Sequence, residues 1–183
     1  MRRLILMRHA KAGWPAGIAT DFDRPLDDKG RQDAHAIGRW LDAEDYRPDL
    51  ALCSASRRTS ETLELLEIPS AVKRIFTDRL YLADTERLMA AIQGAEGSTV
   101  LLLAHNPGVA EMAHLLPRVG AIAHLAAGTP PGATMVMSFE VDDWRGVHWH
   151  SGDVQAYMTP RMLAQKKTAG KSPPLKLSGP KFG

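Results

Sequence analysis

The chain of 183 residues lacks the features that mark several specialised classes of protein. It has a single cysteine, Cys53, which excludes an internal disulfide and is typical of a reducing, cytoplasmic environment. No apolar run approaches the roughly 20 residues needed to cross a bilayer. The basic and then apolar start, residues 1–7, is too short for a signal peptide, and Arg8-His9 interrupts it. We therefore expect a globular domain of ordinary composition that has no membrane partner.

Acidic residues are missing from the end of the chain. All 21 Asp and Glu lie at or before Asp153, whereas six basic residues follow position 158. Residues 1–158 thus hold 17 basic and 21 acidic residues, a net charge of −4, although the whole chain carries +2. Residues 1–165 are expected to form a single domain, and 166–183, rich in Lys, Pro, Gly and Ser, a basic flexible tail. A solubilising role explains this tail more simply than nucleic-acid binding, because zinc-finger spacing and interleaved basic and aromatic residues are both missing.

The chain does contain a regular alternation of apolar runs and segments of helical periodicity. Runs that are apolar at every position indicate strands at residues 4–7 and 100–104, and a nearly apolar run indicates one at 49–53. Residues 72–76 are a further strand candidate. Helical spacing and capping residues predict helices at 28–45, 56–66 and 85–93, and from Pro107 to before Pro117. A turn at 142–146 is expected to join strands 133–141 and 147–150 in a hairpin. These patterns predict an α/β fold of three layers, α/β/α, with a mostly parallel sheet and an antiparallel edge strand or hairpin near the C-terminus.

Charged side chains follow three of the expected strands, at the edge where α/β sheets bind their ligands. Arg8-His9 follows the first strand, Arg58 opens the helix after the second, and His105 ends the strand at 100–104. Each signal alone is weak, because an Arg-His pair occurs by chance and a histidine at a strand end is often merely solvated. Together they predict two imidazoles and two guanidinium groups around one anion.

This set of groups is suited to phosphoryl transfer. A neutral imidazole nitrogen can attack phosphorus and form a covalent phosphoenzyme. Arginines bind phosphate oxygens through paired hydrogen bonds, and their charge disfavours the imidazolium form of a nearby histidine. A second imidazole can donate to a phosphate oxygen when it is protonated or in the right tautomer. The four residues thus supply one nucleophile and three anion-binding partners, and we expect no metal and no cofactor.

Around these residues the sequence resembles the histidine phosphatase superfamily, the phosphoglycerate-mutase-like proteins, and within it the small SixA-type phosphohistidine phosphatases. Residues 4–10 are similar to the family's opening motif, which normally reads Arg-His-Gly, and 23–26 with 29–31 resemble the segment that leads into its first helix. Residues 54–62 resemble the second arginine motif, and 103–107 the second histidine motif. The likeness covers about residues 1–165.

The resemblance implies a phosphoglycerate-mutase-like fold and a metal-independent phosphatase. It makes His9 the residue that is phosphorylated, with Arg8, Arg58 and His105 forming the phosphate pocket. Arg24 is expected to bind substrate, and Lys11 to add positive charge beside it at the rim. The resemblance also implies a bacterial setting, with a phosphorylated protein of the histidine phosphotransfer type, or a small phosphorylated molecule, as the partner.

Two positions depart from the family pattern. Ala10 stands where the family has a glycine, so the backbone there cannot use glycine's freedom at positive φ. Leu82 stands where many members carry the glutamate of an Arg-Leu-x-Glu segment, their general acid. Such acids contribute about 10²–10⁴-fold, so expulsion of an alkoxide should be slow, whereas the imidazole of a phosphohistidine needs less help. Asp84 or Asp78 could replace the missing acid, although exposed or capping carboxylates explain both more simply.

Three functions remain open from the sequence. The leading hypothesis is a phosphatase acting on a phosphohistidine of a signalling protein. The alternatives are a phosphatase for a sugar, nucleotide or phosphoserine-type compound, and a phosphate-binding module without turnover. A pocket with a shallow mouth would suit a protein substrate, whereas a pocket enclosed by walls would suit a metabolite. His148 and His150 would share one face of the expected strand 147–150, a geometry that can bind metal, but we expect neither to be a ligand because no third ligand is in sight.

Overall fold

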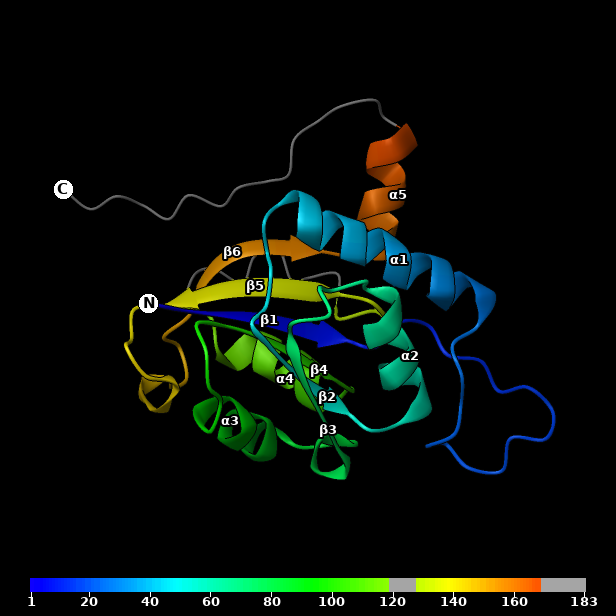
Figure 1. The fold of residues 1–183 in the computed structure, drawn as a ribbon, viewed down its shortest axis with the longest axis horizontal. Helices are drawn as coiled ribbons and strands as arrows, with labels where there is room; N and C mark the ends of the chain where they lie inside the picture. Colours follow the sequence, from blue (N-terminus) through cyan, green and yellow to red (C-terminus); the bar gives the residue numbers. More distant parts are fainter. Residues whose placement is uncertain (119–127, 169–183) are drawn as a thin grey trace.

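A computed structural model describes residues 1–118 and 128–168, whose arrangement is shown in Figure 1. Its middle layer is a six-stranded sheet formed by β1 (Arg2–Arg8), β2 (Leu50–Ser54), β3 (Lys73–Thr77), β4 (Thr99–Ala104), β5 (Thr134–Phe139) and β6 (Asp153–Met158). The strands lie in the order β3-β2-β4-β1-β5-β6. The first four are parallel, β5 is antiparallel to β1, and β6 is antiparallel to β5. The predicted mixed sheet is confirmed.

Helices cover both faces of this sheet. They are α1 (Asp28–Ala43), α2 (Arg57–Leu65), α3 (Thr85–Gln93), α4 (Gly108–Leu115) and α5 (Pro160–Thr168). Helices α1, α2 and α5 lie on one face, and α3 and α4 on the other, which gives the three layers that the sequence predicted (Figure 1). None of the helices in the described residues is long and apolar enough to cross a membrane.

Strand β1 shows why the central strands are apolar throughout. Leu4 and Leu6 pack into the core beneath α3 and α4, whereas Ile5 and Met7 pack into the core beneath α1 and α2. All four side chains are buried. Because successive side chains of a strand point to opposite faces, a strand covered on both faces needs an apolar residue at every position.

The expected strand at 147–150 is wrong, and β6 takes its place in the hairpin. A 3₁₀ turn, η3 (Trp144–Gly146), follows β5, and its buried indole donates from Nε1 to the carbonyl of Gly97 at 2.8 Å. This contact holds the chain away from the sheet edge, and pairing resumes only at β6. His148 and His150 therefore lie in an exposed loop and do not share a strand face.

The sequence offers Asp27 or Asp28 as the cap of the first helix, and the structure shows that Asp27 caps α1, accepting from the N–H of Gly30 at 2.7 Å. The expected domain boundary at 165 falls inside α5, which continues to Thr168. The rest of the expected tail, residues 169–183, lies outside the described residues.

Candidate active site

The carboxyl ends of β1, β2 and β4 meet at one edge of the sheet, as expected for neighbouring parallel strands. Arg8 ends β1 and His9 follows it, His105 directly follows β4, and Arg58 is the second residue of α2. These four residues line one pocket of about 370 Å³. Two larger hollows, of about 520 and 430 Å³, lie elsewhere and lack this cluster of arginines and imidazoles, so we assign the site by its chemistry. The structure thus brings the four predicted residues together in one pocket.

The guanidinium group of Arg58 joins the two imidazoles. Its Nε donates to Nε2 of His9 at 3.3 Å, and its Nη2 lies 3.2 Å from Nδ1 of His105. The two histidine rings have their centroids 5.1 Å apart. All three side chains are buried, with exposed fractions of 8% for His9, 3% for Arg58 and 1% for His105. Arg57, its neighbour, instead points outward and pairs with Glu61 at 2.8 Å.

The hydrogen bonds of His9 leave one ring nitrogen, Nε2, without a hydrogen. Nδ1 lies 2.7 Å from the carbonyl oxygen of Ala10, and a carbonyl can only accept, so Nδ1 carries the hydrogen. Nε2 then holds a lone pair that faces the pocket, consistent with the donation from Arg58. Burial lowers the pKa of His9 to about 4, aided by the charges of Arg58 and Arg8, although the bond to Ala10 opposes the shift. Nε2 is therefore unprotonated at neutral pH.

His105 is also held in one tautomer. Arg58 donates to Nδ1, so Nε2 carries the hydrogen and donates to Oγ of Ser54 at 2.8 Å. Burial lowers the pKa of His105 to about 3, with further lowering from His9 and Arg58. Ser54 ends β2 and is completely buried. The sequence suggested no role for Ser54, although its place as the first residue of the second arginine motif was a usable signal.

A buried threonine ties the turn after β1 to the helix that carries Arg58. The N–H of Ala10 donates to Oγ1 of Thr62 at 3.1 Å, and that hydroxyl donates to the carbonyl of Arg58 at 2.6 Å. Ala10 is fully buried and does not adopt positive φ, so alanine fits the position that holds glycine in the family pattern. The two halves of the site are thus coupled through the backbone as well as through side chains.

Arg8 and Asn106 enclose the pocket from the side of Thr129. Both donate to the Thr129 carbonyl, from Nη1 of Arg8 at 2.9 Å and from Nδ2 of Asn106 at 3.1 Å. Within the described part of the chain, Nε of Arg8 is buried without a hydrogen-bond partner. The Nε–H groups of Arg8 and Arg58 both belong to residues that line this pocket, and the pocket is strongly cationic, as an anion site requires.

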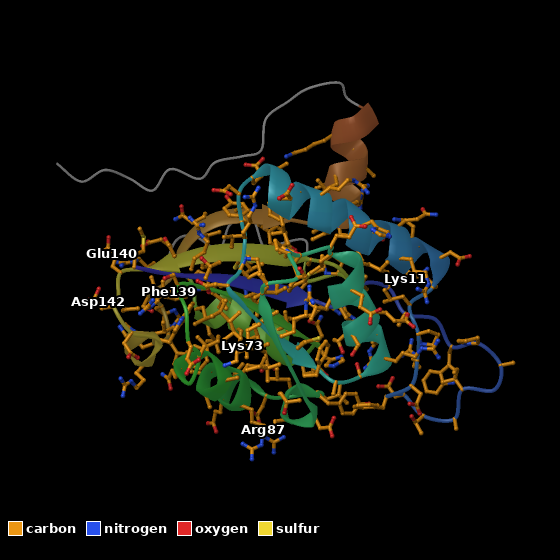
Figure 2. The ribbon with its side chains drawn as sticks, in the orientation of Figure 1. Lys11, Lys73, Arg87, Phe139, Glu140 and Asp142 are labelled. Atoms are coloured by element: carbon orange, nitrogen blue, oxygen red, sulfur yellow. The ribbon has the colours of Figure 1, made fainter. Side chains whose placement is uncertain are left out.

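The two predicted rim cations both line the pocket. Arg24 donates from Nε to the carbonyl of Gly13 at 3.0 Å, and its guanidinium carbon lies 4.8 Å from the ring centroid of Trp14. Lys11 pairs at 3.1 Å with Asp27, the cap of α1. Figure 2 shows Lys11 beside the first turn of α1, at the opposite end of the molecule from Phe139 and Glu140.

One carboxylate at the site was missed by sequence reasoning. Asp21 is the only acidic residue among the described residues that line the pocket. Its Oδ2 accepts from Arg58 Nη2 at 2.9 Å and from the Tyr81 hydroxyl at 2.6 Å, and its Oδ1 accepts from Arg24 Nη1 at 3.0 Å. Burial acts to raise the pKa of Asp21, but these three donors lower it well below the usual range. Asp21 lies in a loop without periodicity, where no sequence signal separates it from neighbouring acids.

The two carboxylates that the sequence suggested as general acids are not in the pocket. Asp84 caps α3, accepting from the N–H of Arg87 at 2.9 Å, and its side chain is exposed. Asp78 begins the 3₁₀ turn η1 (Asp78–Leu80) and does not line the pocket either. Asp84 is therefore a capping carboxylate, the simpler of the two explanations that the sequence allowed. Leu82 does line the pocket, half exposed and with φ of 48°, so an apolar side chain occupies the position of the family's glutamate.

Comparisons with known proteins show which family this chain resembles. The model of the histidine phosphatase superfamily (branch 1) matches residues 4–84, which include Arg8, His9 and Arg58. An uncharacterized protein of Mycobacterium tuberculosis is 35% identical over 115 residues, 62% of this chain and 71% of that protein. An uncharacterized chloroplastic protein of Arabidopsis thaliana is 30% identical over 128 residues, 63% of this chain and 59% of that protein.

Two solved structures extend the likeness past His105. A candidate phosphohistidine phosphatase SixA from Nakamurella multipartitia superposes with a TM-score of 0.78 at 29% identity, covering 87% of this chain and 96% of the other. Its counterpart from Agrobacterium tumefaciens gives a TM-score of 0.74 at 26% identity, covering 87% and 98%. The shared fold thus includes nearly all of the described residues.

Proposed function

We propose that this chain, a member of the histidine phosphatase superfamily whose SixA-like neighbours support phosphatase activity, hydrolyses a phosphohistidine on a signalling protein through a covalent intermediate on His9. One observation carries the proposal. The buried guanidinium of Arg58 lies between Nε2 of His9 and Nδ1 of His105, at 3.3 and 3.2 Å, beside an unprotonated imidazole. An anion-binding group beside an imidazole that can act as a nucleophile supports phosphoryl transfer.

In the first step the hydrogen bond from Arg58 Nε passes from His9 Nε2 to a phosphoryl oxygen, and the freed lone pair of Nε2 attacks phosphorus and forms a P–N bond. The bond from phosphorus to the substrate's ring nitrogen breaks, and that nitrogen keeps the electron pair. The other ring nitrogen carries a proton taken from solvent, so neutral imidazole leaves. Arg8 and Arg58 balance the charge on the phosphoryl oxygens as the group is transferred. The entering dianion also raises the pKa of His105, so that this ring can take up a proton and donate to an oxygen.

In the second step a water oxygen attacks the same phosphorus. The P–Nε2 bond breaks, its electron pair returns to His9, and inorganic phosphate leaves. The proton lost by the water passes to solvent or to the released phosphate. No step needs a metal ion, because the arginines supply the positive charge, and activity should therefore persist in the presence of EDTA. Loss of activity in EDTA would contradict this part of the proposal.

The chemistry of the pocket lining supports phosphohistidine as the substrate. Asp21 is ionised at neutral pH and Leu82 is apolar, so neither can protonate a leaving group. An alkoxide without a proton donor leaves slowly, whereas the imidazole of a phosphohistidine is a better leaving group. Leu82 and Trp14 are both at least half exposed near the site, which suits a phosphoryl group presented on the surface of another protein.

Trapping the covalent intermediate tests the proposal. The protein is incubated with ³²P-labelled phosphoramidate or phosphohistidine and quenched at alkaline pH, where phosphohistidine is stable. We expect label on His9 in the wild-type protein and in the His148→Ala variant, whose histidine is exposed and remote. His9→Ala should bind phosphate and lose both label and hydrolysis. Turnover by His9→Ala at the wild-type rate would overturn the mechanism.

A substrate series tests the choice of substrate. Values of kcat/KM are measured for phosphohistidine, phosphoserine and sugar phosphates with the same preparation. We expect phosphohistidine to exceed the phosphomonoesters by at least about 10²-fold, the lower end of what a general acid contributes. Comparable values for a sugar phosphate would favour a small-molecule phosphatase. Phosphate binding without turnover of any compound would indicate a binding module.

A further inference from the structure

We propose that Asp21 is the positioning residue of this site, and that it acts through Arg58 by holding the guanidinium group in the one orientation that serves both imidazoles. The inference rests on the proposed function. It adds a role for a loop residue that contacts neither His9 nor His105 by a hydrogen bond in the described structure.

Asp21 holds Arg58 at two points. Its Oδ2 accepts from Nη2 at 2.9 Å, and its main-chain carbonyl accepts from Nη1. A planar group with both terminal nitrogens held cannot turn about its Cδ–Nε bond. The remaining donors then point in defined directions, Nε toward His9 and the second N–H of Nη2 toward His105.

Asp21 is itself fixed by groups from other parts of the chain. The hydroxyl of Tyr81 donates to Oδ2 at 2.6 Å, and Nη1 of Arg24 donates to Oδ1 at 3.0 Å. The ring of Tyr81 packs edge-on against His105, with centroids 5.3 Å apart. An asparagine could not replace this carboxylate, because its NH₂ group would face a donor instead of accepting from one.

The ionisation of Asp21 argues against a role as the proton donor. Its three donors keep the pKa of the carboxyl well below the usual range, so it has no proton to give near neutral pH. Its contribution to the rate therefore comes from where it places Arg58. Misplacement of a reacting group by about 1 Å can cost roughly 10²-fold in rate.

A double-mutant cycle tests this role. Asp21→Asn should lower kcat/KM for phosphohistidine by roughly 10²-fold, as expected for loss of positioning. In the Arg58→Ala background, the same substitution should change kcat/KM and the Kd for orthovanadate less than twofold. Independent losses that multiply in the double variant would overturn the proposal. Asp23→Asn is the matched control: it lies two residues away in the same loop, its carboxylate accepts from Thr20, and it should behave as wild type.

Chemical rescue distinguishes positioning from a purely structural role, because a purely structural role of Asp21 would not change the activity that added guanidinium restores. Millimolar guanidinium should restore part of the activity of Arg58→Ala, because Asp21 can hold the free ion where the side chain was. Rescue should disappear in Arg58→Ala/Asp21→Asn, and equal rescue of both variants would overturn the proposal. If Asp21→Asn fails to fold by circular dichroism, Tyr81→Phe takes its place in the cycle. That variant removes one donor from Asp21 and should lower kcat/KM several-fold, again only when Arg58 is present.

Failure of this inference is distinct from failure of the proposed function. A wild-type protein that takes no label on His9 would refute the proposed phosphatase mechanism. A labelled wild type together with a fully active Asp21→Asn would refute only the positioning role.

Discussion

At the scale of single residues, the free site keeps its two imidazoles uncharged. His9 and His105 are buried next to Arg58, and burial with nearby positive charge lowers the pKa of His9 to about 4 and that of His105 to about 3. A histidine in water would be partly protonated at pH 6.5 and would then have no lone pair for attack. The surroundings of His9 thus keep it nucleophilic throughout the physiological range.

This predicts an unusual pH profile for the free enzyme. Only unprotonated His9 attacks, so kcat/KM should stay level from about pH 8 to pH 5 and fall as the pH drops through about 4. The profile is measured with wild type and with His148→Ala as the control, after correction for ionisation of the substrate. An acid limb centred near 6.5 would show that His9 titrates as an ordinary histidine.

A second prediction concerns the leaving group. Leu82 lines the pocket where a proton donor could act, so Leu82→Glu should raise kcat/KM for phosphoserine by at least about tenfold, a fraction of the usual general-acid effect. The backbone there already has positive φ with a leucine, so the exchange adds no comparable strain. Leu82→Gln has nearly the same size and no acidic proton, and equal gains in both variants would exclude acid catalysis.

At the scale of elements, the site depends on how closely the helices on one face of the sheet pack. Helix α2 carries Arg58, and α1 lies against it through Gly38, which faces the carbonyl of Leu66 at the end of α2. A Cβ at position 38 would lie 2.3 Å from that oxygen. The helices could not approach as they do with any other residue at this position.

Gly38→Ala should therefore destabilise the fold. The contact is with backbone, which cannot rotate away, so we expect a loss of roughly 1–3 kcal/mol in the free energy of unfolding, typical of overpacking. Urea denaturation measures it. Gly94→Ala is the control, because its Cβ would meet Ala90 at an ordinary 3.4 Å. Equal stabilities of the two variants would contradict the close approach of α1 and α2.

At the scale of the whole molecule, burial of the two histidines costs stability in acid. Unfolded histidines take up protons below about pH 6.5, whereas folded His9 and His105 do so only near pH 4 and 3. The unfolded state then binds more protons, and the free energy of unfolding falls as the pH decreases. Carboxylates affect the free energy of unfolding mainly below about pH 4.5. Its change with pH above 4.5 therefore reports on the histidines.

We expect the free energy of unfolding to fall by up to about 2 kcal/mol for each buried histidine between pH 6.5 and 4.5. Urea unfolding at a series of pH values measures this slope. A His9→Ala/His105→Ala variant should show a smaller slope over the same range. An unchanged slope in that variant would assign the acid sensitivity to other groups.

The sequence by itself determined the α/β fold and the meeting of Arg8, His9, Arg58 and His105, because both depend on local patterns. Apolar runs specify buried parallel strands, and such strands bring their carboxyl ends to a common edge wherever the intervening helices lie. Only the tertiary structure decided that β6 pairs with β5. It alone decided that Asp21 accepts a hydrogen bond from Arg58 and that Ser54 accepts one from His105. These choices rest on contacts between distant segments, such as the Trp144 indole on Gly97 and the Tyr81 hydroxyl on Asp21, which have no period along the chain.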